Sequence, residues 1–590
     1  MGMFALSAGF GSVYAQPEGV SKLAGGAAAG SARSADAAVI SPDVALPASS
    51  NLVRVGVQTA DPIPLSVSDA IRKVLENNNA IEVTRDDVRF QETQIRAIRG
   101  IYDPVLTLVP TYTRNSTTGS AATNDFSVSA NILHFIKPGG GNYQGFFNNT
   151  RTENAFAQAQ VSSGSLGSSG TSAIYSSSSG VRYTQPLFRN FGIDNTRRNL
   201  KIARRRLEQS DADFRRQTID TIAQVQRTYW DLVFALRDQQ NRQANLDLSR
   251  ENLRQVAARI DAGAAAPIAR WEVETELANR ESDLLLATQQ VSIAENSLKQ
   301  LLLKDASSPE WSQSYVPTDK PVFALDSVSL DDALKSAMDN RYELRRLKLA
   351  NDINAIDISY FRNQTKPQID LNTTFSLVGL ARGGASTESV LVPQFTGNDE
   401  ILRQRLNPLL IAAGQPTIPN PNIEIPGTPP FLAGGFNHSL ANIFRADAPN
   451  YSVGMTISFP FRNRTAKANL AGAEIQRNQI ATLLRQQEQV VLVEVRNAVQ
   501  AVETARLRVL AARRARENAE KQLEGERKLF ESGKSTTFIL FQRENSLTNA
   551  RNLEIRAETD YSKAVADLQR ATSTTFQVNN IEVESPQNDQ

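Results

Sequence analysis

The stretch YSVGMTISFPFRN, residues 451–463, has a two-residue period that stops at a proline. Small polar residues separate its apolar positions, which are Tyr451, Val453, Met455, Ile457 and Phe459. This period is typical of a β-strand with one apolar and one polar face. A strand that crosses a membrane needs about 9 to 11 residues with such alternation. IDLNTTFSL, residues 369–377, shows the same pattern, so both stretches are candidate membrane strands.

Prolines mark four places where the pattern changes between helical and extended. Pro104 and Pro367 come where a helical pattern gives way to a strand, and Pro186 and Pro460 where a strand gives way to a helix. Proline lacks the N–H of a strand ladder and tolerates an early helical position, so it ends strand pairing. The sequence therefore predicts four strands. A half-buried strand of a soluble sheet alternates in the same way. If the strands do form a membrane barrel, several chains must build it, because four cannot enclose a watery interior.

Long helices separate these strands. From about Asn195 to Ile260, apolar residues recur at steps of seven and then of three and four, the seam of a coiled coil. A helix of about 65 residues extends roughly 100 Å at 1.5 Å per residue. The arginines near its start and the mixed charges on its other faces are typical of solvated helix surfaces.

The chain contains a tandem duplication. SVSDAIRKVLENNNAIEV from Ser66 aligns with SLDDALKSAMDNRYELRR from Ser329, and RIDAGAAAPIARWEVETEL aligns with LFESGKSTTFILFQRENSL. In the second pair Gly263 meets Gly533 and Trp271 meets Phe541. We therefore expect one structural unit copied once. The predicted segments are a signal peptide (1–15), a flexible segment (16–61), a first repeat (62–303), a linker (304–327), a second repeat (328–575) and a tail (576–590).

Composition excludes several kinds of function. Lysine and arginine number 64 against 62 acidic residues, which gives no support for nucleic-acid binding. The absence of cysteine excludes disulfides, thiolate metal sites and cysteine nucleophiles. His134 and His438 lie far apart in Gly/Asn-rich stretches, so we expect two loop histidines rather than a metal or catalytic site. The chain also lacks a phosphate-binding loop and a nucleophile motif, so an enzyme has no support.

The N-terminal stretch MGMFALSAGFGSVYAQ favours a signal peptide. Its apolar core is followed by Val13 and Ala15 at the small-residue positions of a cleavage site. A basic segment before that core is missing, so an unstructured tail and a start farther upstream stay open. No run reaches the roughly 18 apolar residues of a membrane-spanning helix.

The duplication, the QPLF and FPF junctions and the segment LFESGKSTTFILFQRENSLTNAR together resemble the TolC-like outer membrane efflux proteins over residues 62–575. The resemblance implies a mainly α fold with transmembrane β. Tandem-repeat coiled-coil helices would form a periplasmic α-barrel, and four strands per chain would complete the twelve-stranded outer membrane barrel of a homotrimer. Its implied partners are outer membrane lipid, a periplasmic adaptor and an inner-membrane pump or ABC transporter. It implies no catalytic residue, cofactor or metal.

The resemblance also assigns sites to the glycine breaks, which would be periplasmic tips where the adaptor docks. The tip residues are Gly263, Ala264, Ala265, Pro267, Gly533, Lys534, Ser535 and Thr536. A glycine there is also a helix C-cap. Some relatives narrow the tunnel with acidic residues six and nine positions after the second glycine. Here Ile539 and Gln542 stand there, which argues against a carboxylate gate from that hairpin. Glu272 is either a substitute or a solvated helix carboxylate.

Two long Gly/Ser/Asn/Pro-rich segments, 115–173 and 381–448, are expected to be extracellular loops. Within the first, FSVSANILHF at 126–135 is consistent with a hairpin that extends beyond the membrane, and the sequence does not assign it. The expected function is a passive trimeric duct that exports small molecules or proteins. The alternative is a structural periplasmic coiled-coil protein, which explains the helices but not the strands that end at prolines.

Overall fold

The computed structural model describes residues 54, 57–116, 118, 122–153, 173–263, 266–321, 323–324 and 327–583, all within one unit that starts at Arg54. The expected signal peptide and most of the expected flexible segment lie outside these residues. The helices are α1 (Val67–Asn77), α2 (Asn79–Arg99), η1 (Gly100–Tyr102), α4 (Asn195–Asp261), α5 (Ile268–Leu302), η2 (Pro309–Ser312), α6 (Leu330–Asn340), α7 (Tyr342–Gln364), α8 (Gly397–Ala412), α9 (Phe436–Phe444), α10 (Arg464–Glu531), α11 (Thr537–Thr572) and α12 (Thr575–Val578). The strands are β1 (Gln58–Leu65), β2 (Val105–Asn115), β3 (Thr123–Phe135), β4 (Asn142–Glu153), β5 (Ala173–Pro186), β6 (Gln313–Pro317), β7 (Gln368–Arg382), β8 (Val390–Pro393), β9 (Asn422–Ile425) and β10 (Pro449–Ser458).

Equivalent helices of the two halves begin in the same way and have nearly equal lengths. The Ser66 hydroxyl accepts the Asp69 N–H at the start of α1, and the Ser329 hydroxyl accepts the Asp332 N–H at the start of α6. Both helices have 11 residues. The long helices α4 and α10 have 67 and 68 residues, and α5 and α11 have 35 and 36. The mainly helical architecture predicted from the sequence is confirmed.

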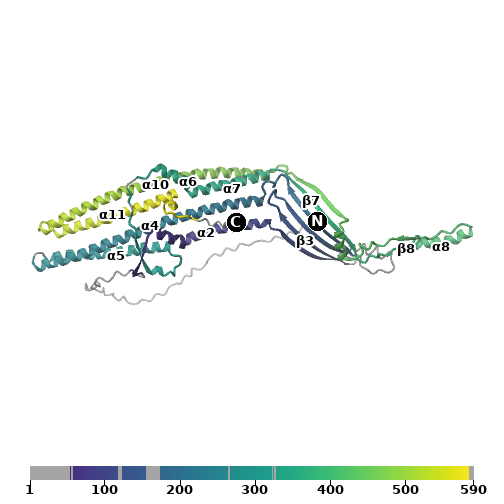
Figure 1. The fold of residues 1–590 in the computed structure, drawn as a ribbon, viewed down its shortest axis with the longest axis horizontal. Coiled ribbons are helices and arrows are strands. Elements are labelled where there is room, and N and C mark those ends of the chain that lie inside the picture. Colours follow the sequence, from purple (N-terminus) through teal and green to yellow (C-terminus); the bar gives the residue numbers. More distant parts are fainter. Residues whose placement is uncertain are drawn as a thin grey trace, which may run out of the picture. The chain divides into compact units, whose positions relative to one another are not determined.

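The long helices form two antiparallel hairpins, α4 with α5 and α10 with α11, and α11 also packs on α4 (Figure 1). Buried side chains along α4 follow the predicted seam and include Leu200, Phe214, Ile222, Tyr229 and Leu232. None of the helices in the described ranges is long and apolar enough to cross a membrane.

Strand β1 corrects the predicted limit of the flexible N-terminal segment. It begins at Gln58, before the expected end at residue 61, and pairs in parallel with β6 from the expected linker. Close by, the buried Arg54 forms an ion pair with the buried Glu295. The main-chain bonds of β1 and this charge pair hold part of the segment that composition predicts to be flexible.

Six strands in the described part of the chain form one antiparallel sheet, in the order β10-β7-β5-β4-β3-β2. The four predicted strands are present as β2, β5, β7 and β10. The predicted number of four strands in this sheet is nevertheless wrong, because the hairpin β3–β4 lies between β2 and β5. Its alternating pattern was hidden in a segment that composition assigned to a loop.

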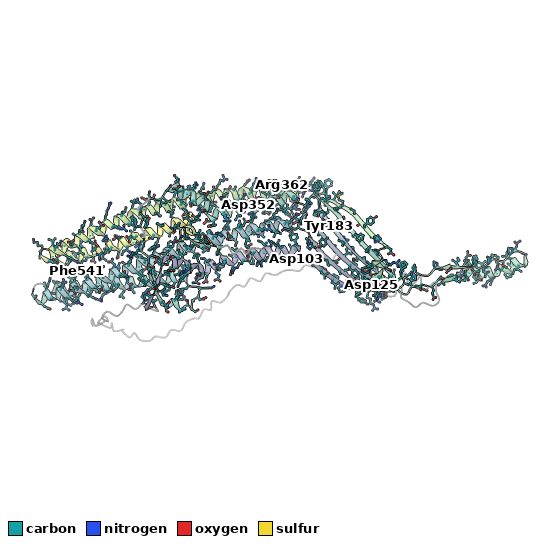
Figure 2. All side chains as sticks on the ribbon, viewed as in Figure 1. Asp103, Asp125, Tyr183, Asp352, Arg362 and Phe541 are labelled. Atoms are coloured by element: carbon teal, nitrogen blue, oxygen red, sulfur yellow. The ribbon has the colours of Figure 1, made fainter. Side chains whose placement is uncertain are left out.

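The β3–β4 hairpin also corrects the predicted place of the first long loop. Asp103 lies at the helix end of β2 and Asp125 near the opposite end of β3 (Figure 2). The β3–β4 turn, residues 136–141, returns to the helix end, because Leu133 pairs with Val105 beside Asp103. Residues 123–135 and 142–153 of the segment expected outside the cell are therefore part of the sheet. His134 lies in β3 and not in a loop, and its ring stacks on Tyr143 with centroids 5.0 Å apart.

The second long segment contains β8, α8, β9 and α9. Helix α9, which carries His438, packs on β5 and β7. The Ser439 and Ser177 hydroxyls are 2.8 Å apart. At Gly379 a Cβ would lie 2.0 Å from the Ser439 carbonyl oxygen, so only glycine permits this approach. The expectation of a loop histidine is wrong for His438 as well.

Candidate channel tips and wall junctions

The first helical hairpin turns at Gly263. Its φ of +71° is in the left-handed region, which favours glycine, and its N–H donates to the Ile260 carbonyl at 2.9 Å. Pro267 then precedes α5 in a helical conformation. Gly263 and Pro267 are exposed. Ala264 and Ala265, the other two predicted tip residues of this hairpin, lie outside the described residues.

The second hairpin turns at Gly533 with a complete C-terminal cap. Gly533 has a φ of +74°, and its N–H donates to the Phe530 carbonyl at 3.1 Å. The Lys534 N–H donates to the Leu529 carbonyl at 2.9 Å, which completes a Schellman motif. The Thr536 hydroxyl then caps the start of α11. The Lys534 side chain is exposed at this tip.

Ser535 is less exposed than expected for a residue of the predicted tip loop. It is half-buried, and its hydroxyl donates to the Glu526 carboxylate on α10. Among the second-tip residues, Gly533, Lys534 and Thr536 are exposed. A surface for a partner would therefore be formed by these three positions rather than by Ser535.

The two hairpin ends contact each other. The Arg259 guanidinium lies over the Phe530 ring, 4.6 Å from its centroid. Phe541 of α11, labelled in Figure 2, forms a buried cluster with Val256 of α4 and Val273 of α5. These contacts fix the ends of the two hairpins against each other within one chain.

The three predicted aperture residues differ in exposure. Glu272 and Gln542 are exposed, whereas Ile539 is half-buried and its N–H is the donor to the Thr536 cap. In α11 the nearest carboxylate after Gln542 is Glu544, which is 3% exposed. Glu544 faces the first hairpin, so its role within the chain is an inter-hairpin contact.

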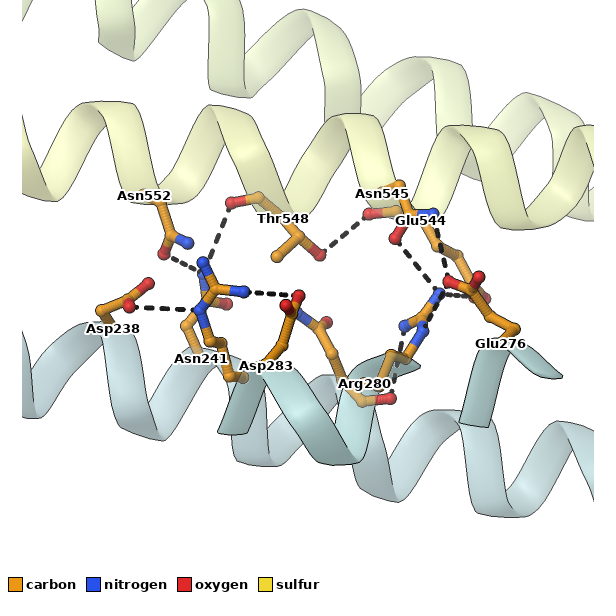
Figure 3. Close-up of polar contacts among 11 residues, drawn as sticks. Asp238, Asn241, Glu276, Arg280, Asp283, Glu544, Asn545, Thr548 and Asn552 are labelled. Carbon is orange, nitrogen blue, oxygen red and sulfur yellow. Dashed lines mark hydrogen bonds and ion pairs between the residues drawn. The ribbon is translucent and has the colours of Figure 1, made fainter. Parts of the chain in front are cut away.

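Polar side chains join the two hairpins around Arg280 (Figure 3). Its Nε lies 3.0 Å from Glu276 Oε1 on the same helix, and its Nη2 donates to Asn545 Oδ1 of α11 at 3.3 Å. Asn545 Nδ2 in turn donates to Glu276 Oε1 at 3.2 Å. Arg280 Nη2 is 3.9 Å from Glu544 Oε2. Burial raises the pKa of Glu544, while Arg280 and Arg527 oppose that rise.

A second polar group follows along the same hairpin contact (Figure 3). Asn241 Nδ2 of α4 donates to Asn552 Oδ1 of α11 at 2.5 Å. Arg242 bridges Asp238 and Asp283 at 3.1 and 2.6 Å. Sequence reasoning missed both groups. The available signal for the first group was the occurrence of Arg280 and Glu544 at positions where the coiled-coil pattern places apolar residues.

The four junction prolines lie at the ends of strands. Pro104 and Pro367 immediately precede β2 and β7, Pro186 is the last residue of β5, and Pro460 follows β10 by two residues. The last ladder bond beside Pro186 runs from the Leu187 N–H to the Ile369 carbonyl at 2.8 Å. At Pro104 and Pro367 the main chain changes from helix to strand geometry, and at Pro186 and Pro460 from strand to helix geometry.

Amide side chains connect these junctions and were not found from the sequence. Gln364, at the end of α7, donates to Asn190 Oδ1 at 2.8 Å and accepts from Arg189 Nε at 2.7 Å. Asn463 adopts a left-handed φ of +41° before α10 and donates to the Gln364 carbonyl at 3.3 Å. The C-terminal end of α7 thus bonds to the residues that precede both α4 and α10.

Residues 150–302 and 432–574, just over half of the chain, match the model of the outer membrane efflux protein family. The chain belongs to this family. The matched segments contain β5, α4 and α5 of the first half and β10, α10 and α11 of the second. An outer membrane efflux protein is a channel protein, and this finding confirms the resemblance seen in the sequence.

Solved channel structures have the same fold as this efflux protein. CusC is 15% identical with a TM-score of 0.57, covering 86% of this chain and 91% of that chain. The CmeC outer membrane channel of Campylobacter jejuni is 12% identical with a TM-score of 0.54, covering 88% and 90%. The open MtrE outer membrane channel of Neisseria gonorrhoeae is 16% identical with a TM-score of 0.54, covering 86% and 88%. No curated protein matches the chain.

Proposed function

We propose that three copies of this efflux protein form a passive outer membrane duct, and that its helical tips dock a periplasmic adaptor linked to an inner-membrane pump or ABC transporter. The observation that carries the proposal is the open sheet. Within the described sheet, β2 and β10 each bond to one neighbour only. These edges run antiparallel, so β10 of one copy can pair with β2 of the next. Such closure removes the edges, which a membrane does not tolerate.

The faces of the sheet support a position in the membrane. The exposed positions on one face of β10 are Tyr451, Val453, Met455 and Ile457, whereas the other face carries serine, glycine and threonine. The first face would contact lipid and the second a watery lumen. These same strands count against a periplasmic coiled-coil protein without a barrel.

The helices support closure of a ring as well. Trp271 of α5 occupies the position that Phe541 has in α11. Phe541 is 9% exposed, because α11 packs on the first hairpin, whereas Trp271 is 65% exposed. A second copy whose α10–α11 hairpin lay against α5 would cover Trp271, as the first hairpin covers Phe541.

The tips support docking by their exposure and their fixed geometry. Gly263, Pro267, Gly533, Lys534 and Thr536 are exposed, and helix caps at Gly263, Gly533 and Thr536 fix the two turns. A cationic lysine on such a turn suits an acidic or polar partner surface. The chain would supply a path, and the inner-membrane partner would supply the energy.

The assembly is tested by light scattering on the detergent-purified protein, with correction for bound detergent. We expect a trimer, and a monomer would contradict the duct. Docking is tested by Lys534→Glu, with Lys467→Glu at the exposed opposite end of α10 as the matched control. We expect Lys534→Glu to reduce export at least tenfold with normal trimer levels in the outer membrane. Normal export would refute docking at this tip, whereas an equal loss with the control would point to a general charge effect.

A further inference from the structure

The β3–β4 hairpin is an internal part of the sheet. Strand β3 pairs with all 11 residues of β2, and β4 pairs with β5 along all 12 of its own residues. Strand β3 itself has 13 residues. Both strands exceed the about 9 to 11 residues that a membrane strand needs. The hairpin therefore has the length and the ladder of a membrane-wall element.

The hairpin also continues the two faces of the sheet without a change of phase. One row of directly opposed residues runs from β2 to β10 and consists of Leu106, Ile132, Gly145, Val181, Phe375 and Tyr451. The adjacent row, on the other face, consists of Thr107, Asn131, Phe146, Gly180, Ser376 and Asn450. The first row is apolar or glycine, and the second is mostly small or polar. In the second row Phe146 covers Gly180, where a Cβ would lie 2.8 Å from its ring.

The amino acids of the hairpin suit the same environments as those of its neighbours. In the part of the hairpin nearer its turn, the outward positions include Val128, Ala130, Ile132 and Phe147, and the inward positions include Ser127, Ser129, Asn131 and Asn148. Leu133 and Phe146 are apolar exceptions on the inward face, and the polar Asn149, Arg151 and Glu153 continue the outward face towards the far end of β4. The stretches FSVSANILHF and YQGFFNNT contain no acidic residue, lysine or arginine. A hairpin projecting into water would have no need of such a lipid-compatible face.

The turn of the hairpin is fitted to the helix end of the sheet. Gln185 of β5 donates to the Gly139 carbonyl at 2.9 Å. Gly140 has a φ of +70°, and a Cβ there would lie 2.6 Å from Arg197 Nη2 and 2.8 Å from the Asn190 carbonyl oxygen. At Gly141 a Cβ would lie 2.9 Å from the Thr184 carbonyl oxygen. The hairpin is thus anchored where β5 gives way to α4.

We infer that each chain contributes the six strands of its described sheet to the membrane wall, so that the trimer closes an eighteen-stranded barrel. This inference rests on the trimeric duct proposed above. The helices that meet this sheet at the four proline junctions are α2, α4, α7 and α10. The hairpin therefore widens the wall in the membrane without adding a helix to the tunnel.

The hairpin sets the bore of the pore. The diameter of a barrel grows roughly in proportion to its strand number. With strands about 4.8 Å apart and tilted by about 40°, eighteen strands give about 36 Å between opposite main chains, against about 24 Å for twelve. Cargo size is then limited by the helical tunnel and its tips, and the barrel offers a wide, mostly hydroxyl- and amide-lined exit.

Strand order can be read by disulfide cross-linking, because the chain contains no native cysteine. Leu106→Cys with Ile132→Cys joins directly opposed residues of β2 and β3, and we expect it to cross-link in the outer membrane. Leu106→Cys combined in turn with Ser179→Cys, Val181→Cys or Tyr183→Cys of β5 should not, since two strands intervene and Cα atoms more than about 7 Å apart cannot be bridged. Phe375→Cys with Tyr451→Cys is the positive control in either order. Cross-links from β2 to β5 would overturn the inference.

The bore is tested by electron microscopy of the trimer, with a variant lacking residues 123–153 as the comparison. We expect eighteen strands in the intact protein and a barrel about one third narrower after the deletion. Twelve strands in the intact protein would overturn the inference. Failure to form a trimer would instead refute the proposed duct, and the cross-links within each chain would still report the position of the hairpin.

Discussion

The equivalent helices of the two halves have nearly equal lengths, whereas the segments that connect the strands of each half have different secondary structure. The first half inserts β3 and β4 into the sheet, and the second inserts β8, α8, β9 and α9. A coiled-coil seam fixes helix length, since an insertion turns the apolar stripe away from its partner. A sheet is held by main-chain bonds, which any added antiparallel pair can supply. The two repeats therefore differ in the segments between their strands, where main-chain hydrogen bonds can accommodate an insertion.

The same comparison reveals one helical difference. Trp271 and Phe541 are equivalent, yet only Phe541 is buried within the chain. Likewise Glu544 is 3% exposed, whereas its counterpart Glu274 is half-buried. The equivalent helices α5 and α11 thus have different neighbours within the chain. The predictions below test this difference in packing and the difference between the two halves of the sheet.

The largest effect is expected from Phe541→Ala. It opens a cavity between the hairpins and should lower the free energy of unfolding by about 3 to 5 kcal/mol. Trp271→Ala should leave the fold of the separated chain within about 0.5 kcal/mol and weaken the trimer instead. Thermal unfolding and light scattering distinguish these outcomes. Equal losses of fold stability would show that the two positions are equivalent after all.

A charge on the lipid face is the next largest change. Met455→Arg in the second half and Ile132→Arg in the inserted hairpin should each cost about 2 to 4 kcal/mol at mid-bilayer depth. Thr456→Arg and Asn131→Arg, on the opposite face, are the matched controls and should cost far less. The measurement is denaturant unfolding from lipid vesicles. If Ile132→Arg behaved like Asn131→Arg, the hairpin would not face lipid.

Glycine substitutions compare the inserted turn with a tip. Gly263→Ala introduces a strained left-handed alanine into open space and should cost about 1 kcal/mol. Gly140→Ala adds an overlap with Asn190 and Arg197, so we expect about 2 to 4 kcal/mol. Chemical denaturation, with proteolysis of the hairpin as a local readout, measures both. Similar costs would mean that the turn is not fitted to the junction.

The smallest effect concerns two glutamates with opposite pH dependence. Burial disfavours the charge of Glu494, but Arg341 and Arg570 outweigh it and lower the pKa of that carboxyl. Its stabilising contribution is therefore present above the usual glutamate pKa and is lost as pH falls through the lowered value. For Glu544, whose pKa burial raises, the contribution is present below the usual pKa and is lost as pH rises through the raised value.

At neutral pH, Glu494→Gln should therefore cost about 1 kcal/mol, and this cost should disappear in acid. Glu544→Gln should not destabilise the protein at neutral pH. Thermal midpoints of both variants from pH 3 to 8 check the signs. A neutral-pH loss for Glu544→Gln that matched the loss for Glu494→Gln would show that the ion pairs of Glu544 outweigh its burial.

The sequence predicted the helices, because the seam from Leu200 to Leu236 has a period that no other structure produces over that length. It also located Pro104, Pro186, Pro367 and Pro460 beside strands. It left β3 unassigned and missed β4, because their serines and asparagines resemble a loop until the partner strands fix which side faces lipid. The contact between Arg280 and Asn545 could not be predicted from the sequence either, because the two residues are 265 positions apart.

Strand order in the sheet also has a consequence for folding. From β2 to β5 each strand pairs with the next one along the chain, and the connections, residues 116–122, 136–141 and 154–172, are short beside the one from β5 to β7. The β5–β7 pair instead joins Ile174 to Arg382, across the whole of the first helical hairpin. Contacts of such sequence separation form slowly. We therefore expect the first-half meander to form before the second half adds β7 and β10.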